Sequence, residues 1–393
     1  MKRTLITNVC IVDGGEHKSG GILIADHMIE AILPSGVTIE DAQTIDGHGY
    51  YASSGFIELH CHGGNGYDFM DCTQEAYLGI CEMQLAHGVT TLLPTTATDS
   101  DHAIRNTIDA FRQTRQTMQT RQFLPGIHIE GQYISSARNG GMFEKYIKNP
   151  DYDEYSALIA YADGDIARWS AAPELEGGML FGDYCKDHGI VASIAHSDAT
   201  YDDVVLAMQH GYTHLTHFYS DMNTIVRKNG FRVMGAIEAA YDLDDLWIEV
   251  IADGCHIPPA LMNYIYRHIG ADRMHIVSDC IRPAGLEGPI VDVGTPGRKL
   301  EGLLEDGVVK FTDRSAFHGS IAQGDMLVQT MHCKCGLPLT DCIRMISENP
   351  AKIMHIENQK GRLLPGMDAD IVLFDKSITT KQVYYRGMLV VSK

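Results

Sequence analysis

The chain has 393 residues, of which 45% are hydrophobic and 21% are charged, so a disordered or fibrous protein is excluded and a sizeable core is expected. Its 51 acidic residues outnumber its 31 lysines and arginines, which gives a net charge of −20. This negative charge repels phosphate backbones and anionic lipids, and the sequence holds no basic patch to offset it. Nucleic-acid and membrane partners are therefore not expected.

The first segment of the chain resembles a strand more than a targeting signal. Its apolar positions alternate with polar ones and do not form the continuous apolar run of a signal peptide. The ten cysteines are therefore expected as reduced thiols in a cytoplasmic protein. Cys333 and Cys335 lie close together, but no second pair follows at the spacing of a thiolate metal site, so a structural or incidental role is favoured.

Residues 1–53 are predicted to form short strands and turns, with strands at 4–13 and 20–35. From Gly55 onward, apolar strand-like runs alternate with longer segments of helical period, which is the pattern of repeated βα units. These strands are predicted at 55–62, 89–96, 124–131, 166–174, 190–197, 212–219, 247–256 and 273–280. Eight such units predict an α/β fold of the (β/α)8 TIM barrel type over residues 54–360.

The segments between and after the strands are long enough for helices in most places. Helices are predicted at 74–87, 101–121, 179–188, 323–335 and 339–347. The long segment 131–165 is expected to carry a loop over the active face, and the Gly- and Pro-rich segment 284–302 is predicted as a loop.

Strand character returns at the end of the chain, at 368–377 and 381–391. Residues 1–53 and 361–393 are therefore expected to fold together as a small β-sandwich domain beside the barrel. A doubly wound α/β sheet is the alternative fold, but the sequence has no glycine-rich dinucleotide turn to support it.

A barrel of this type holds its active site at the carboxyl ends of its strands, and metal-binding residue types gather there. These residues are His60, His62, Glu130, His196, His217, His256 and Asp279. Imidazoles and carboxylates are the ligands of Zn, Mn and Fe, and the His-x-His spacing directs both rings to one side of the first strand. A single histidine at a strand end is usually a satisfied polar residue, but so many together favour a metal site. His214 is three residues from His217, is expected to face the other way and is left out of the set.

A series of short motifs follows along nearly the whole chain: GFIELHCHG, GIHIEG, SAAPE, AHSDATY, THLTHFYSDM, ADGCHIPP, IVSDC, ENPAKIMHI and LLPGMDADIVLFD. In this order they resemble the N-acetylglucosamine-6-phosphate deacetylases of the amidohydrolase superfamily. The motif PGxDAD alone is shared by many amidohydrolases, whereas the full set matches one family. The resemblance implies a metal-dependent hydrolase of a linear amide bond, with a β-sandwich beside its barrel and a homodimeric state.

The resemblance also implies roles for individual residues. Glu130, His196 and His217 match the family's principal metal ligands, and His60, His62 and Asp279 match positions that bind a second metal in many members. One or two divalent ions are therefore expected, zinc first with iron or manganese as alternatives, and Glu130 would bridge two ions.

The expected reaction converts N-acetylglucosamine 6-phosphate to glucosamine 6-phosphate and acetate. A bound metal lowers the pKa of its water toward ~7, so that a hydroxide attacks the amide carbonyl at neutral pH. Asp279 is expected as the catalytic residue, a general base toward the water and then a general acid toward the leaving amine.

Two expected substrate contacts depart from the family pattern. The family's Gly-Ala-His, whose His helps to polarise the carbonyl, aligns with Gly140, Gly141 and Met142, and a thioether cannot donate that hydrogen bond. The family's Asn-Ala, which contacts the phosphate end of the sugar, is replaced by Ser220 and Asp221. A carboxylate repels a phosphate by ~1 to 4 kcal/mol at 4 Å, depending on the surroundings.

Three further residues are candidates for substrate binding. Arg227 and His256 are candidate contacts to an anion, with Arg227 either reaching across a dimer interface or standing as a solvated loop charge. His318 resembles part of the family's late loop over the sugar.

Two other functions stay open from the sequence. One is an amidohydrolase that acts on a different N-acyl amine, such as a non-phosphorylated or other amino sugar, an N-acyl amino acid or a cyclic amide. The other is a barrel that binds a sugar without turnover, although the complete set of charged residues, which is costly to bury, argues against it.

Overall fold

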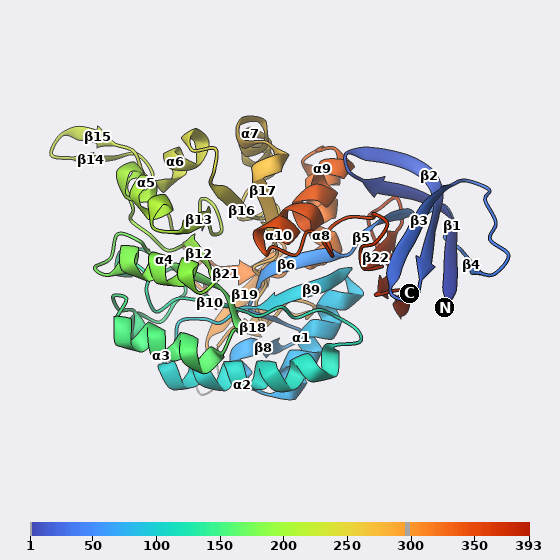
Figure 1. Ribbon diagram of the computed structural model, residues 1–393. Helices are drawn as coiled ribbons and strands as arrows, with labels where there is room; N and C mark the ends of the chain where they lie inside the picture. The colour runs from blue at the N-terminus through green and yellow to red at the C-terminus, as the bar shows by residue number, and fades with distance from the viewer. Residues whose placement is uncertain (1, 295–298) are drawn as a thin grey trace.

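The computed structural model describes residues 2–294 and 299–393 (Figure 1). Strands and helices alternate around a barrel, and a sheet that contains both chain termini lies beside it (Figure 1). None of the helices in the described residues is long and apolar enough to cross a membrane. All ten cysteines are free, as expected from the sequence.

All eight predicted barrel strands are present, and each is shorter than predicted. They are β6 (Phe56–Cys61), β9 (Val89–Pro94), β10 (Ile127–Glu130), β11 (Ile166–Ala171), β12 (Val191–Ile194), β13 (Tyr212–Leu215), β16 (Trp247–Ile251) and β17 (Met274–Val277). Six of them form a parallel sheet in the order β10-β11-β12-β13-β16-β17, and β6 pairs in parallel with β9. Single bridges from Thr95 to His128 and from Cys61 to Cys280 connect the two sheets into a ring, which confirms the predicted barrel class.

Helices follow most of these strands and surround the barrel. They are α1 (Gln74–Ala86), α2 (Asp101–Met118), α3 (Tyr152–Ala162), α4 (Gly178–Asp187), α5 (Tyr201–Gln209), α6 (Ala236–Asp242) and α7 (Pro259–Ile269). Side chains that cap the first turn determine where several of them begin: the oxygens of Thr73, Ser100, Asp151 and Thr200 each accept a backbone N–H from the helix that follows.

Helix α3 corrects one prediction, because segment 131–165 is a loop only in its first part. Tyr155, Leu158, Ile159 and Ala162 are buried at helical spacing, and Asp151 caps the helix. The loop before α3 contains only short 3₁₀ turns at Ser136–Arg138 and Glu144–Tyr146.

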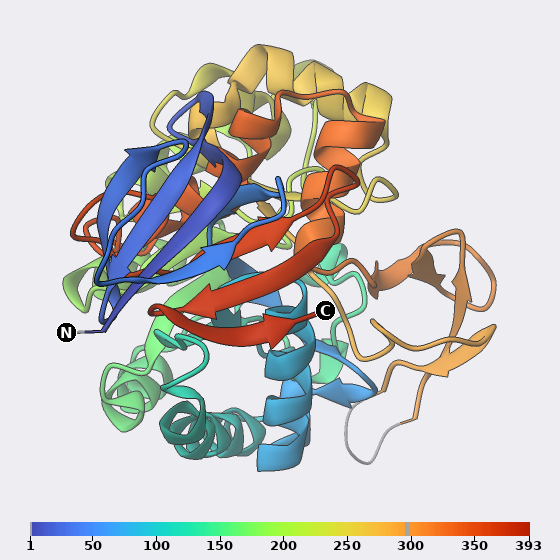
Figure 2. The same ribbon diagram turned by 90° about the vertical axis from the view of Figure 1, so that its right-hand side faces the viewer.

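The segment after β17 contains a small antiparallel sheet that the sequence analysis missed. Its strands are β18 (Ile290–Asp292), β19 (Glu301–Glu305), β20 (Val308–Lys310) and β21 (Phe317–Ser320). The loop prediction for 284–302 is therefore wrong at β18 and at the start of β19. Figure 2 shows this sheet as the orange strands that project from the barrel.

The chain then returns to helix, as predicted, before it enters the terminal sheet. The elements are α8 (Gly324–Gln329), a π-helix (Thr330–Lys334), α9 (Leu339–Ile343), a second π-helix (Arg344–Glu348) and α10 (Asn349–Ile353). Earlier in the chain, β14 (Val226–Lys228) and β15 (Phe231–Val233) form a hairpin that projects from the barrel (Figure 1).

Both termini contribute to one sheet. Its strands are β1 (Arg3–Asp13), β2 (Glu16–Ala25), β3 (Met28–Pro34), β4 (Gln43–Asp46), β5 (Tyr51–Ser54), β22 (Ile371–Phe374), β23 (Thr380–Tyr385) and β24 (Met388–Ser392). Strand β5 joins the two ends of the chain, because it pairs with β1 on one side and with β22 on the other (Figure 2). A separate apolar core, which includes Ile6, Ile22 and Leu373, stabilises this sheet. Domain boundaries at 53/54 and 360/361 stay a prediction.

A buried ion-pair cluster lies where the barrel chain returns to the terminal sheet. Lys360 is 5% exposed, and its ammonium lies 2.6 Å from Asp370 and 3.0 Å from Asp368. Asp370 also accepts the backbone N–H of Arg386 at 2.8 Å, in the turn between β23 and β24. Removal of Lys360 would leave a buried carboxylate without a counter-charge.

Lys360→Met should therefore lower the free energy of unfolding by ~3 to 5 kcal/mol. The matched control is Lys352→Met, which removes a partly exposed pair with Glu348 and should cost less than ~1 kcal/mol. Urea denaturation of both variants gives the comparison. Equal losses in the two variants would contradict the special role assigned to the buried pair.

Candidate metal centre

A cavity of about 420 Å³ lies at the carboxyl ends of the barrel strands. Its lining includes five of the predicted metal ligands: His62, Glu130, His196, His217 and Asp279. Apolar side chains complete much of the wall, among them Met142, Ile251, Ile281, Val293, Leu300, Phe311 and Phe317. The cavity thus combines a polar, titratable group of side chains with apolar walls, as small-molecule sites commonly do.

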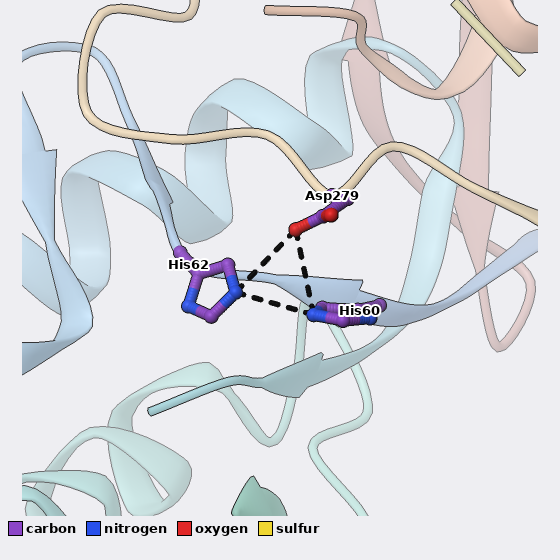
Figure 3. A group of neighbouring side chains, drawn as sticks. All are labelled: His60, His62 and Asp279. Carbon is purple, nitrogen blue, oxygen red and sulfur yellow. Dashed lines mark hydrogen bonds and ion pairs between the residues drawn. The ribbon is translucent and has the colours of Figure 1, made fainter. Parts of the chain in front are cut away.

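Two groups of three side chains are arranged to hold metal ions. We call His60, His62 and Asp279 the first cluster; its three ligand atoms lie within 4.8 Å of one another (Figure 3). The Nε2 atoms of His60 and His62 are 3.2 Å apart, and Oδ1 of Asp279 lies 3.4 Å from each. The second cluster consists of Glu130, His196 and His217, whose ligand atoms also lie within 4.8 Å of one another.

Glu130 connects the two clusters. Its Oε2 lies 2.9 Å from Nε2 of His62 and 3.2 Å from Nε2 of His60. Its Oε1 lies 3.1 Å from Nε2 of His217 and 3.6 Å from Nε2 of His196. One carboxylate therefore presents one oxygen to each cluster, which is the arrangement that a bridge between two ions requires.

The backbone at three of these residues lies in the left-handed region. His196, His217 and Asp279 have φ of 46°, 32° and 45°. Each lies two residues beyond the end of its strand, which corrects the prediction that they stand on the strands themselves. Such conformations cost ~1 to 3 kcal/mol each in residues other than glycine and concentrate at functional sites.

Backbone and side-chain acceptors orient two of the four rings. Nδ1 of His196 lies 2.7 Å from the carbonyl oxygen of Arg138, and Nδ1 of His60 lies 2.8 Å from Oε1 of Glu249. An Nδ1–H that donates to an oxygen leaves the lone pair of Nε2 free, and in both residues Nε2 faces its cluster. This donor set of imidazole nitrogens and carboxylate oxygens fits a divalent metal ion such as Zn²⁺.

The electrostatics of the ion-free clusters show strong pairing between imidazoles and carboxylates. Burial lowers the pKa of His62, but hydrogen bonds to Asp279 and Glu130 outweigh it and raise that pKa to about 10. Burial likewise lowers the pKa of His60, yet the charges of Asp279, Glu130 and Glu249 hold it well above its usual value. Burial raises the pKa of Asp279, but the charge of His60 and the hydrogen bond from His62 lower it to about 2.

Five of the six predicted substrate-binding residues line the cavity: Met142, Ser220, Asp221, His256 and His318. Met142 accepts the backbone N–H of Thr98 through its sulfur at 3.5 Å. Oδ2 of Asp221 lies 3.6 Å from Nδ1 of His196, so a carboxylate that lines the cavity stands close to a predicted metal ligand.

His256 and His318 differ in their surroundings. Nδ1 of His256 lies 2.6 Å from Asp253, and this hydrogen bond outweighs the effect of burial and raises the pKa of His256. Burial lowers the pKa of His318, whose ring packs against Phe311 at 4.1 Å between centroids. His256 is therefore the better placed of the two to carry a positive charge toward an anion.

The structure does not bring Arg227 into the cavity of its own chain. Arg227 lies on β14 in the projecting hairpin and is exposed. His214, left out of the metal set, belongs to neither cluster and is buried beside Trp247 at 6.3 Å between ring centroids.

Two residues near the centre escaped the sequence analysis. Glu249 and Arg168 are both 0% exposed and form an ion pair inside the barrel. The sequence does mark both residues, because each is a charged residue inside an otherwise apolar predicted strand: Glu249 in WIEVIADG and Arg168 in IARWSAAP.

Comparisons with known proteins agree with the motifs. Residues 51–390 match the model of the amidohydrolase family. The chain is 28% identical over 390 residues to an N-acetylglucosamine-6-phosphate deacetylase of Lysinibacillus sphaericus, covering 98% of this chain and 97% of the relative. It is 27% identical over 368 residues to an N-acetylgalactosamine-6-phosphate deacetylase of Escherichia coli O157:H7, covering 93% of each.

Solved structures share the fold over their full length. The N-acetylglucosamine-6-phosphate deacetylase of Pasteurella multocida superposes with a TM-score of 0.90 at 25% identity, covering 99% of this chain and 100% of that one. A Mycobacterium smegmatis structure, a deacetylase in complex with N-acetyl-D-glucosamine-6-phosphate, gives 0.90 at 24% identity and full coverage of both chains. Because the family model spans most of the sequence and the architecture agrees throughout, the chain belongs to the amidohydrolase family.

Proposed function

We propose that this protein removes the N-acetyl group from N-acetylglucosamine 6-phosphate, or from a closely related amino-sugar phosphate, to give the free amine and acetate. The observation that carries the proposal is the pair of buried clusters joined by Glu130 in the wall of a cavity of about 420 Å³. A cavity of this size suits a small ligand such as a phosphorylated sugar. The names of the relatives, deacetylases of two N-acetylhexosamine 6-phosphates, support the same substrate class.

The same clusters support a metal cofactor, for which zinc is the first candidate and iron or manganese the alternatives. Glu130, His196 and His217 would hold one ion, and His60, His62 and Asp279 would hold a second. A divalent ion in such a site polarises the amide carbonyl and makes its bound water acidic.

Asp279 is the proposed proton carrier. Its low pKa keeps the carboxylate ionised at neutral pH, and it lines the cavity, so it can accept a proton from the attacking water. The protonated carboxyl then donates to the nitrogen of the departing amine, which is otherwise too basic to leave. Met142 takes no part in this transfer, because its sulfur accepts a backbone N–H and has no proton to donate.

The proposal extends to a cytoplasmic homodimer. The hairpin that carries Arg227 is exposed, and Phe231 at the same hairpin is 75% exposed, so this surface is suited to contact a second copy. In such a homodimer, Arg227 is a candidate to contact the cavity of the second copy, since it does not line the cavity of its own chain.

A second candidate function, hydrolysis of a non-phosphorylated N-acyl amine, is favoured by Asp221. Its carboxylate lines the cavity, and in the sequence it stands where the resemblance implies a contact to the phosphate end of the sugar. Like charges repel, so Asp221 opposes a phosphate there unless Arg227 or His256 compensates.

Binding of Zn²⁺ to the ion-free protein should release protons and weaken as the pH falls. The raised pKa values of His60 and His62 mean that both rings are protonated at neutral pH without an ion, and each must lose a proton before its Nε2 can bind a metal. Calorimetric titrations at about pH 6 and about pH 8, in buffers of different ionisation enthalpy, measure the affinity and the protons released. Equal affinity at the two pH values would contradict this reading of the clusters.

Asp279→Asn should reduce the rate of amine release from N-acetylglucosamine 6-phosphate by ~10²- to 10⁴-fold, because the proton carrier is lost. Asp244→Asn, at a carboxylate with 95% side-chain exposure, is the control and should keep the wild-type rate. Metal content is measured in parallel so that loss of an ion is not mistaken for loss of the proton carrier. A metal-loaded Asp279→Asn protein with near wild-type turnover would show that the assignment is wrong.

Asp221→Asn should lower KM for N-acetylglucosamine 6-phosphate by ~5-fold or more, since about 1 kcal/mol of repulsion per unit charge is removed at 4 Å even in water. For unphosphorylated N-acetylglucosamine the change should be small. Parallel kcat/KM measurements on both sugars separate a charge effect from a general disturbance of the site. Equal changes on the two substrates would refute the placement of the phosphate near Asp221, and a wild-type preference for the unphosphorylated sugar would favour the second candidate function.

A further inference from the structure

Glu249 of β16 is a buried carboxylate that contacts both metal clusters from outside the cavity. Its Oε1 accepts a hydrogen bond from Nδ1 of His60 at 2.8 Å and another from the backbone N–H of His217 at 3.1 Å. His60 belongs to the first cluster and His217 to the second. Glu249 does not line the substrate cavity, so any effect on the chemistry must act through these residues.

Arg168 of β11 holds the other oxygen of this carboxylate. Its Nη1 pairs with Oε2 of Glu249. Its remaining hydrogen bonds reach three further segments: Nε donates to Ser193 at 3.0 Å, Nη2 to Thr216 at 3.0 Å and Nη1 to the carbonyl oxygen of Leu59 at 3.5 Å. The guanidinium is therefore fixed from several strands at once, and the carboxylate it holds has no freedom to rotate away from His60.

The chemistry of the two partners determines which nitrogen of His60 faces the cluster. An ionised carboxylate can only accept hydrogen bonds, so Nδ1 of His60 must keep a proton toward Glu249, and the proton that a metal ion displaces is the one on Nε2. The lone pair of Nε2 then points toward Glu130 and Asp279, at 3.2 and 3.4 Å. The second hydrogen bond fixes the backbone N–H of His217, a residue with the strained φ of 32°.

We propose that Glu249, held by Arg168, is the positioning residue of the metal centre and that tight metal binding at the first cluster depends on it. The inference rests on the metal centre proposed above. If the ion pair only filled the barrel interior, Oε1 of Glu249 would not need to accept both of its hydrogen bonds from residues of the two clusters. Partners of this kind contribute ~10- to 100-fold in metal affinity where they have been removed.

The variant Glu249→Gln distinguishes positioning from filling of space. The amide is nearly the same size as the carboxylate, but one of its two ends is an NH₂ group. If the NH₂ faces Arg168, it meets the N–H groups of the guanidinium, and two hydrogen-bond donors then oppose each other. If it faces His60, Nδ1 must accept and the proton moves to Nε2, which then cannot bind an ion.

The matched control is Glu58→Gln. Glu58 is a buried glutamate that accepts the backbone N–H groups of His60 and Ser278, at 3.0 and 2.9 Å, and makes no hydrogen bond to the imidazole ring. The control thus changes a buried glutamate close to His60, one whose pKa burial raises to about 7, without changing which ring nitrogen carries the proton.

The full chain is titrated with Co²⁺, and both the number of ions bound and the visible absorption of the bound cobalt are recorded. We expect Glu249→Gln to bind the first-cluster ion ~10- to 100-fold more weakly and to change the cobalt spectrum, while Glu58→Gln keeps both properties. Wild-type affinity and an unchanged spectrum in Glu249→Gln would overturn the inference and leave the proposed function intact. A wild-type protein that binds no ion would overturn both.

A second measurement needs no variant of Glu249 and so does not depend on its folding. In the zinc-loaded wild-type protein with ¹⁵N-labelled histidine, a long-range ¹H–¹⁵N spectrum shows which ring nitrogens carry protons. The His60 signals are identified by their loss in His60→Gln. A proton on Nδ1 of His60 supports the inference, and a proton on Nε2 overturns it.

Discussion

The carboxylate of Glu130, with one oxygen toward each cluster, is the interaction on which the rest of the centre depends. It brings a second negative charge close to Asp279 in a buried site at the ends of the barrel strands, and such charges cost several kcal/mol each to bury unless positive charge lies beside them. The imidazoles of His60 and His62, whose pKa values these carboxylates raise, lie beside them and can carry that positive charge. Metal ions would replace the protons on the Nε2 atoms of these imidazoles. The same carboxylates would therefore balance the positive charge of either the protons or the ions.

The cluster residues around Glu130 have strained backbones, and buried barrel strands hold them in place. Three cluster residues have left-handed backbones just beyond strand ends, a cost of a few kcal/mol in total that only a rigid support can sustain. Strands β10 and β17 provide such support, since every residue in each is buried. Inside the barrel, Arg168 donates a hydrogen bond to Ser193 on the neighbouring strand. Its partner Glu249 accepts the backbone N–H of the cluster residue His217, so the buried ion pair connects barrel strands to the clusters.

The sequence predicted those parts of the structure whose signal is local. Apolar runs located all eight barrel strands, and residue type at their ends located both clusters. The sheet β18–β21 was missed because its strands are only three to five residues long, and β18 lies in a Gly- and Pro-rich segment. Strand length was overestimated at His196, His217 and Asp279, because the turn into a left-handed backbone has no glycine to mark it. Glu249 was overlooked because its partners come from other strands, and a single sequence does not show which strands are neighbours.

The departures from the family pattern fall on loops, whereas the proposed chemistry is held at strand ends. Met142 and Asp221 lie in the loops that follow β10 and β13, and the sulfur of Met142 accepts the backbone N–H of Thr98. Asp221 differs, because its carboxylate lies 3.6 Å from Nδ1 of His196 and also faces the cavity. A negative group that a substrate places beside Asp221 would therefore meet a like charge close to a cluster residue. In the proposed reaction the clusters act on the acyl group, and Asp221 selects against a negative group near the same cluster unless a positive side chain compensates it.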